Sequence, residues 1–300
     1  MRGGDGLREG VVVNLNKPPD ITSHQAARKV QRILGASKAG HAGTLDPFAE
    51  GVLLVCLNDA TRIAEYLLPL EKEYMARIRL GLVTDTLDIT GKVVSEEDPS
   101  GITGGMIAEV LGRFRGELMQ IPPMYSAIKR DGVPLYRLAR RGVTVRREER
   151  RVFVREIELI SFVPPEFVMR VRCSKGTYVR SLARDIGEAL GVGAVVSALR
   201  RTAVGDFRVE DSVSFSDLEG GAAPVSSMDD ALGHLGEIVL DSGQFRLARH
   251  GTEFFSAAAG SPGDLFRLKD PSGAFFAIGR LKDGGVMKVE KVFLHSSPKT

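Results

Sequence analysis

The spacing of apolar and polar residues predicts a chain in which strands and helices are interspersed. Mostly apolar runs at 10–17 and 52–57 are typical of buried strands, and the alternation over 73–81 predicts a third strand. Between the first two strands, apolar residues recur at helical spacing over 26–34, which predicts a helix that ends at Gly35. We expect further helices at about 61–68, 103–113, 135–141, 177–190 and 228–235, and paired strands at 152–162 and 167–173.

Beyond residue 236 the pattern changes to short strand-like runs separated by turns. These runs lie at 238–240, 264–268, 274–281 and 285–293. We therefore expect an α+β protein of two domains: a mixed sheet flanked by helices over 1–235, and a small β-rich domain over 236–300.

Composition and motifs argue against several classes of function. The chain has 300 residues, of which 43% are hydrophobic, enough for a sizeable core. Its longest uncharged apolar run, 52–57, is far shorter than the roughly 18 residues of a membrane span. Residues 1–5 lack a signal-peptide pattern, so we expect a cytoplasmic protein without a membrane segment. The two cysteines, Cys56 and Cys173, and five scattered histidines suggest neither a disulfide framework nor a metal site, and no nucleotide-binding motif is found.

The net charge of +3 conceals an uneven distribution along the chain. Residues 1–112 carry −3, residues 113–208 carry +10 and residues 209–300 carry −4. Most of the charge between residues 137 and 151 is arginine, whose planar guanidinium matches phosphate groups and stacks on bases. We expect residues 122–151 to form a basic arm that projects from the core, and charge alone leaves open whether it binds a polyanion such as nucleic acid or is a solvated face.

One loop gathers side chains that can do chemistry. Asp46 lies between His41 and Glu50, just before a predicted buried strand. Taken singly, however, an Asp-Pro pair is a common turn, Lys17 before a proline is ordinary, and Tyr74 fits the core of a strand. These residues alone leave a catalytic role open.

The order of short motifs resembles that of a known enzyme family. Residues 40–47 read Gly-His-Ala-Gly-Thr-Leu-Asp-Pro, which looks like the catalytic signature of the TruB family, the bacterial tRNA pseudouridine-55 synthases. The resemblance covers residues 11 to about 210. Further blocks that match in the family's order lie at 16–18, 72–74, 84–91, 120–129, 135–142, 173–180 and 199–201.

This resemblance implies a fold, a reaction and a partner. The fold is the mixed sheet of pseudouridine synthases, followed by a domain similar in position and size to the family's RNA-binding PUA domain. The reaction isomerises uridine to pseudouridine at position 55 in the T-loop of tRNA, without cofactor or metal. The partner is the T-arm of tRNA, and we expect a monomer. Because the tail is acidic, its RNA contact is expected to be local, at Arg246, Arg249 and Lys288.

The resemblance also assigns residues to the site. Asp46 matches the family's nucleophile, which attacks the target nucleotide at either C1′ or C6, and Arg180 matches the arginine that keeps it ionised. His41 matches the residue that fills the space left when the base flips out. The other expected substrate contacts are Lys17, Tyr74, Tyr178 and Leu199.

We expect the arm to close on the RNA backbone and to be mobile without RNA. Its expected contact residues are Lys129, Arg130, Arg137, Arg140 and Arg141.

Two positions depart from the family pattern. Ala42 stands where many members have threonine, which we expect to matter little. Glu50 stands where a small or hydroxyl residue is usual; we expect it to face solvent or pair with an arginine, although a carboxylate close to Asp46 would oppose its ionisation.

Three other functions are alternatives to a tRNA pseudouridine synthase. They are a guide-RNA-dependent synthase, a non-catalytic RNA-binding or folding-helper protein, and a glycosidase that uses Asp46 and Glu50. The glycosidase is disfavoured because sugar sites usually need aromatic platforms, and the chain has no Trp and only 6% aromatic residues.

Overall fold

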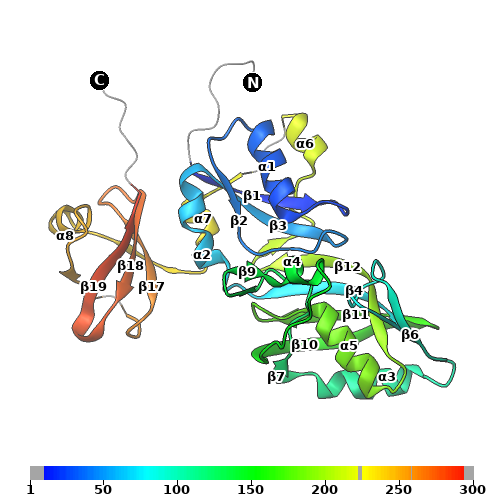
Figure 1. Ribbon diagram of the computed structural model, residues 1–300. Helices are drawn as coiled ribbons and strands as arrows, with labels where there is room; N and C mark the ends of the chain where they lie inside the picture. The colour runs from blue at the N-terminus through cyan, green and yellow to red at the C-terminus, as the bar shows by residue number, and fades with distance from the viewer. Residues whose placement is uncertain (1–9, 222–224, 258, 294–300) are drawn as a thin grey trace.

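The computed structural model describes residues 10–221, 225–257 and 259–293. Most of the chain is organised by one ten-stranded sheet, with the strand order β14-β1-β3-β12-β4-β11-β10-β7 and with β2 and β13 added beside β3 and β12 (Figure 1). These strands are β1 (Val11–Lys17), β2 (Ala39–His41), β3 (Glu50–Leu57), β4 (Lys72–Leu80), β7 (Gly116–Gln120), β10 (Arg150–Val163), β11 (Glu166–Cys173), β12 (Ala194–Val204), β13 (Phe207–Arg208) and β14 (Val225–Ser227).

The helices are mostly short. They are α1 (Ser23–Ile33), α2 (Ala64–Leu67), α3 (Gly104–Arg113), α4 (Leu135–Ala139), α5 (Val179–Ala189), α6 (Phe215–Glu219), α7 (Met228–Ala231) and α8 (Ser242–Ala248). Two 3₁₀ turns lie at Asn58–Arg62 and Asp283–Gly285. The remaining strands form the hairpins β5 (Leu82–Thr84) with β6 (Val93–Glu96) and β8 (Lys129–Arg130) with β9 (Val133–Pro134).

The large sheet consists of two halves joined where β3 runs parallel to β12. At this junction Arg200 and Arg201 pair with Glu50 and Gly51, whereas the other ladders of this sheet are antiparallel. Gly51 has φ +102°, and a Cβ there would lie 2.2 Å from the Arg201 carbonyl oxygen. A residue without a side chain is therefore required for the two halves to meet.

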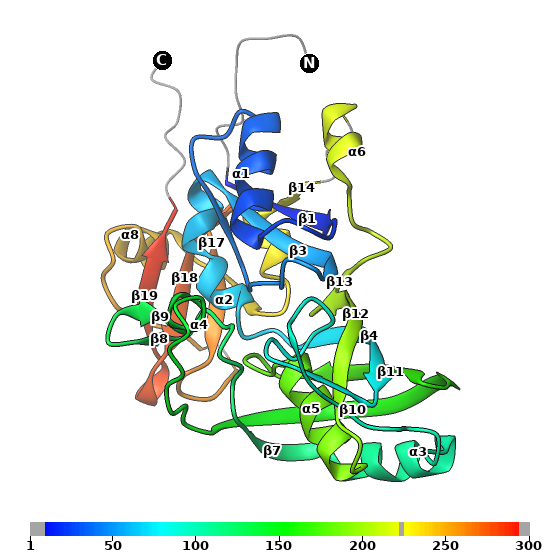
Figure 2. The same ribbon diagram turned by 45° about the vertical axis from the view of Figure 1, so that its right-hand side comes forward.

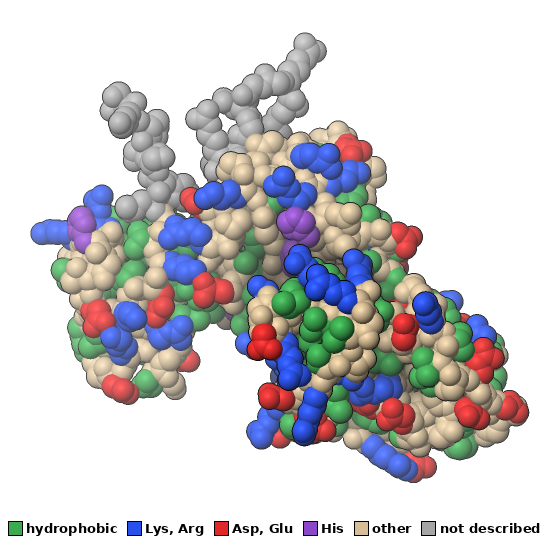
Figure 3. Space-filling model, viewed as in Figure 1, with side chains coloured by type: hydrophobic (Ala, Val, Ile, Leu, Met, Phe, Trp, Pro, Cys, Tyr) green, Lys and Arg blue, Asp and Glu red, His purple; other side chains and the backbone are tan. Residues whose placement is uncertain are grey.

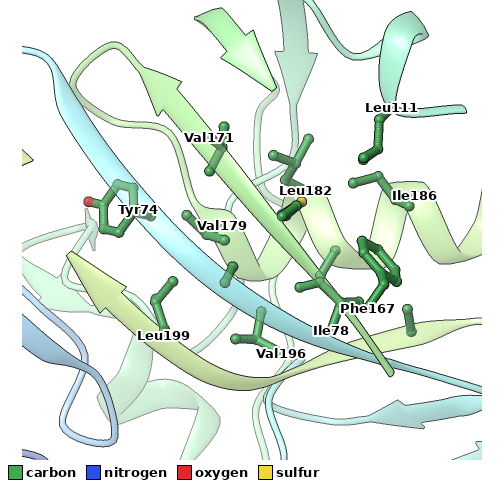
Figure 4. Close-up of a cluster of buried hydrophobic side chains, with 14 of the residues drawn as sticks. Tyr74, Ile78, Leu111, Phe167, Val171, Val179, Leu182, Ile186, Val196 and Leu199 are labelled. Carbon is green, nitrogen blue, oxygen red and sulfur yellow. The ribbon is translucent and has the colours of Figure 1, made fainter. Parts of the chain in front are cut away.

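Each half of the sheet has its own core. One side of β1 and β3 packs on α1 and α6, and Thr22 begins α1 as a capping box with Gln25. In the other half, α3 and α5 cover β4, β10, β11 and β12, as Figure 4 shows for Ile186, Leu182 and Phe167. The amphipathic helices predicted from the sequence thus lie with their apolar faces on the sheet.

A second sheet is formed by the end of the chain. Its order is β15-β17-β18-β19-β16. These strands are β15 (Gly236–Val239), β16 (Phe254–Phe255), β17 (Leu265–Lys269), β18 (Phe275–Leu281) and β19 (Val286–Val292). It lies beside the half of the large sheet that contains β1 and β3 (Figure 1).

The two sheets are joined by a shared core. Ile278 and Phe293 are buried in the same cluster as Val12, Ile63 and Leu232 of the first sheet and its helices. Polar contacts surround this cluster: Lys291 bonds Glu65, Arg267 pairs with Asp229 at 2.7 Å, and Arg62 lies 4.6 Å from the centre of the Phe293 ring.

Residues 121–149 form an arm between β7 and β10, which extends away from the large sheet in Figure 2. It carries the hairpin β8–β9 and the helix α4. Its root is hydrogen-bonded to the body, since Ser181 donates to the Ile121 carbonyl, and Arg147 donates to the Pro122 carbonyl within the arm itself. Farther out, bonds such as Leu135 N to the Ile128 carbonyl join arm residues to one another.

The predicted elements agree with the structure except in three respects. The expected helix at 61–68 begins as the 3₁₀ turn Asn58–Arg62, and α7 ends at Ala231, four residues earlier than expected. Other elements were not predicted: the strands β2, β5, β6, β7, β8, β9, β12, β13, β14 and β16 and the helices α6 and α8. Of these β12 matters most, because it lies at the centre of the large sheet.

Candidate active site

The candidate site is built around the loop between β2 and β3. Ser23, at the start of α1, exchanges two hydrogen bonds with the backbone of Leu45: its Oγ donates to the carbonyl at 2.9 Å and accepts from the amide at 2.8 Å. Leu45 is itself buried in the core beneath α5. These contacts fix the backbone immediately before Asp46.

Asp46 forms a two-pronged ion pair with Arg180, near the start of α5. Arg180 donates from Nε to Oδ2 and from Nη2 to Oδ1, both at 2.8 Å. Only 4% of the Arg180 side chain is exposed, against 28% of Asp46. Burial raises the pKa of Asp46, and the charge and hydrogen bonds of Arg180 oppose that rise. The pair thus presents a carboxylate that faces outward and a guanidinium that is enclosed.

The remaining donors of Arg180 connect the pair to two other segments. Nη1 donates to the Thr86 carbonyl at 2.9 Å and lies 3.5 Å from Asp88 Oδ2, and Nη2 also donates to the Tyr125 carbonyl at 2.8 Å. Asp88 is buried and accepts from Thr86 and Thr90. The motif that contains Asp88 was noted in the sequence as a turn and as a block that matches the family, but no role was assigned to Asp88.

A buried apolar surface lies next to the ion pair. Leu45, Tyr74, Val179 and Leu199 belong to one cluster, and Figure 4 shows Tyr74 and Leu199 at the same end of it. Burial raises the pKa of Tyr74, which keeps its hydroxyl protonated at neutral pH. An aromatic ring and a leucine beside a carboxylate can hold the flat faces of a base.

Tyr178 is held from the backbone. The Gln120 side chain, which is 3% exposed, accepts from the Tyr178 amide at 2.7 Å and donates to its carbonyl at 3.1 Å. Burial raises the pKa of Tyr178. Gln120, which sequence reasoning did not single out, thereby fixes the residue that precedes α5.

Lys17 differs from the expectation of a substrate contact. Its side chain is fully buried, and Nζ donates to the carbonyls of Pro18, Ile21 and Pro47 at 2.8, 2.9 and 3.1 Å. Burial lowers its pKa to about 8. All three ammonium donors are therefore engaged, one with the loop of Asp46 and two with the segment between β1 and α1, and none is left for a substrate.

His41 ends β2, ahead of the loop. Burial and the nearby charge of Arg201 lower its pKa, so the ring is neutral at pH 7. Its Nδ1 is buried without a hydrogen-bond partner among the described residues.

Neither departure from the family pattern disturbs Asp46. Glu50 pairs with Arg200 at 3.7 Å and is half exposed, as expected from the sequence. Ala42 is fully buried and packs in the core shared by the two sheets.

The expected RNA contacts of the arm are all exposed. On the face shown in Figure 3, Lys and Arg side chains gather over the arm and beside it. The expected arm residues on its surface are Lys129, Arg130, Arg137, Arg140 and Arg141. In the second sheet, Arg246 and Arg249 on α8 and Lys288 on β19 are exposed as well.

The described part of the chain offers neither a metal-binding cluster nor a membrane-spanning helix. It contains no cluster of three or more His, Cys, Asp or Glu side chains that could hold a metal ion. None of its helices is long and apolar enough to span a membrane.

Comparison with known proteins identifies this arrangement. The family described as "TruB family pseudouridylate synthase (N terminal domain)" matches residues 31–179, and the "tRNA pseudouridylate synthase B C-terminal domain" matches residues 180–241. The tRNA pseudouridine synthase B of Pseudomonas aeruginosa (strain UCBPP-PA14) is 42% identical over 92% of this chain and 93% of its own. That of Azoarcus sp. (strain BH72) is 51% identical over 75% of this chain and 73% of its own.

The fold also matches solved structures. A chain of the Cbf5-Nop10-Gar1 complex superposes with a TM-score of 0.75 at 31% identity, covering 95% of this chain and 85% of that chain. A chain of an H/ACA RNP bound to a substrate RNA containing 2'-deoxyuridine gives 0.73 at 28% identity, covering 95% and 85%.

The chain therefore belongs to the TruB family of pseudouridylate synthases. Within that class it is a tRNA pseudouridine synthase, an enzyme that isomerises uridine in tRNA.

Proposed function

We propose that the enzyme acts on uridine 55 in the T-loop of tRNA and that Asp46 attacks the target nucleotide. The observation that carries this proposal is the ion pair with Arg180. Its two 2.8 Å bonds hold the carboxylate ionised while leaving it accessible at the edge of a buried apolar surface. A nucleophilic carboxylate needs this combination of charge, orientation and access.

The neighbouring residues suit a flipped base. A uridine within a folded loop is stacked, so the enzyme must extrude it at a cost of a few kcal/mol. We assign the stacking surface to Tyr74 and Leu199, and a further side of the pocket to Tyr178. His41, neutral and with a free Nδ1, is suited to fill the space that the base leaves. Lys17 receives a positioning role, because its ammonium group is fully engaged.

We extend the proposal to the rest of the chain. Residues 1–235 form the catalytic domain, and residues 236–300, of which 294–300 lie outside the described part, form a PUA-like RNA-binding domain. The arm supplies contacts to the RNA backbone and is mobile until RNA binds. The enzyme works as a monomer on the T-arm of tRNA in the cytoplasm.

The test is tritium release from a T-arm RNA that carries C5-labelled uridine only at position 55. The wild type should release the label, because the new glycosidic bond forms at C5 and displaces that hydrogen. Asp46→Asn should abolish release while binding the RNA as well as the wild type does. The matched control is Glu50→Gln, four residues along the same loop, which should remain active because Glu50 pairs with Arg200 at the surface.

The same assay separates the alternatives. Release from bare RNA, without guide RNA or partner proteins, excludes a guide-dependent enzyme. Activity of Asp46→Asn would contradict the proposed nucleophile, and an equal release from a label placed in the anticodon loop would contradict the proposed site.

A further inference from the structure

Arg201 of β12 is the largest of the fully buried side chains among the described residues, with 1% of its surface exposed. Its guanidinium donates hydrogen bonds to backbone carbonyls. Nε donates to Val52 at 2.6 Å, Nη1 to Thr44 at 3.2 Å and Nη2 to Gly43 at 3.3 Å. One side chain therefore holds the Asp46 loop on both sides, before Asp46 and after it.

The charge of Arg201 has no carboxylate partner within the described part of the chain. Arg180 by contrast pairs with Asp46, and Arg267 with Asp229 and Glu237. Burying an unpaired cation costs several kcal/mol, and an apolar side chain of similar size would avoid that cost. General packing therefore does not account for an arginine here, whereas three donors in a fixed planar fork do.

The backbone of Arg201 also lies between β3, which follows the Asp46 loop, and β4, which carries Tyr74. It pairs with Gly51 on β3 and with Tyr74 on β4. Its side chain faces the Tyr74 hydroxyl, where its charge counteracts the rise that burial causes in the pKa of that group. Arg201 thus bonds the Asp46 loop and lies opposite Tyr74 on the neighbouring strand.

We propose that Arg201 is a positioning residue, which sets the Asp46 carboxylate and the Tyr74 ring at the spacing that the target uridine requires. The inference rests on the proposed role of Asp46 as nucleophile. It assigns Arg201 to the chemical step and not to RNA binding, because the side chain is enclosed and cannot touch the substrate.

The test compares Arg201→Met and Arg201→Lys with the matched control Arg200→Met, its exposed neighbour on the same strand. Tritium release and tRNA affinity are measured for each, together with the thermal midpoint. We expect Arg201→Met to lose about 100-fold in kcat with an unchanged Kd for tRNA, since small misplacements of a reacting group have effects of this size. Arg201→Lys keeps the charge but not the fork, so it should recover only part of the rate. Arg200→Met should match the wild type.

Other outcomes overturn the inference. A wild-type kcat in folded Arg201→Met contradicts it, as does a loss that appears only in Kd. If neither variant folds, Arg201 is a stability residue and the inference is wrong. Inactivity of the wild type, or activity of Asp46→Asn, would instead refute the proposed function, so the two failures can be told apart.

Discussion

Asp46 depends on an arginine 134 residues further along the chain for its charge state. Burial alone would favour the neutral acid, and the two hydrogen bonds from Arg180 favour the carboxylate. Other contacts fix the positions of both partners of the ion pair. Ser23 and Lys17 hold the loop of Asp46, and the carbonyls of Thr86 and Tyr125 accept from the Arg180 guanidinium.

Replacing Arg180 should change how the rate depends on pH. In Arg180→Met the opposing charge is gone and burial remains, so the pKa of Asp46 rises and less of it is ionised at neutral pH. We expect kcat at pH 7 to fall by about 100-fold or more, and the acid limb of the kcat profile to move to higher pH. The measurement is single-turnover tritium release between pH 5 and 9.

Two further variants make this prediction specific. Arg180→Lys keeps the charge, so its acid limb should stay near that of the wild type although the rate falls. Arg184→Met, one turn further along α5, should behave as the wild type because Arg184 pairs with Asp185. An acid limb in Arg180→Met that does not move would show that Arg180 does not control the ionisation of Asp46.

The sequence could indicate which residues meet at the site, but not what each side chain does there. Asp46, Arg180, Tyr74 and Leu199 were matched through motifs, and the structure brings them together. Lys17 was expected at the substrate from the family resemblance, and of its three carbonyl partners Pro47 comes from a distant segment that meets Lys17 only in the fold. These contacts leave no pattern in the sequence.

At the scale of elements, the arm is attached to the site through its root. Gln120 bonds Tyr178, Ser181 bonds Ile121, and the Tyr125 carbonyl accepts from the same guanidinium that holds Asp46. The outer part of the arm instead offers exposed cations, so its root and tip have different tasks.

Neutralising the tip should weaken binding without slowing chemistry. In a variant with Arg137, Arg140 and Arg141 changed to Gln, we expect a higher Kd for tRNA and a shallower salt dependence, by about 0.7–0.9 in log–log slope per lost phosphate contact. The rate at saturating tRNA should be unchanged. Binding isotherms over a range of KCl concentrations measure the Kd for tRNA and its salt dependence.

The control for this variant is Arg113→Gln on α3, where Arg113 pairs with Glu109 at the surface. Its salt dependence should equal that of the wild type. An unaltered slope in the arm variant would show that these three residues do not contact phosphates.

The strands β12 and β7 were missed by sequence analysis for different physical reasons. Strand β12 has the buried Arg201 near its middle, and a charged residue in an apolar run reads as an exposed position or a strand end. Strand β7 is short and lies at the edge of the sheet, and its exposed positions hold Glu117 and the apolar Met119, so apolar residues do not mark its buried face. The helix α1 and the strand β4 were predicted because their apolar periodicity follows the solvent boundary, and β1 and β3 because their mostly apolar runs are typical of buried strands.

At the scale of the whole molecule, the two sheets are coupled more tightly than the sequence suggested. The sequence predicted a separate β-rich unit from residue 236, and no pattern in it indicated that Ile278 and Phe293 would be buried against β3 and α7. Such contacts depend on two surfaces that form independently and then match.

Removing one of these side chains should uncouple the sheets. Phe293 is 2% exposed, so Phe293→Ala should lower the free energy of unfolding by about 3–5 kcal/mol. We expect calorimetry to show two transitions where the wild type shows one. Phe255→Ala, at a position 67% exposed on the same sheet, should change stability by less than about 0.5 kcal/mol. A single transition in Phe293→Ala would mean that other contacts suffice to hold the sheets together.

Ile278 and Phe293 of the C-terminal sheet are buried in a core shared with β3, the strand that follows the loop of Asp46. The RNA-binding surfaces proposed for the two parts would then lie at a fixed distance from each other. Under the proposed function, a correctly folded tRNA would contact both surfaces at once and the second contact would form at a high effective concentration, whereas a tRNA with a disrupted tertiary fold would first have to be ordered at an entropic cost. Preference for intact tRNA would therefore reside in the spacing of the two surfaces, and not in the chemistry of either one.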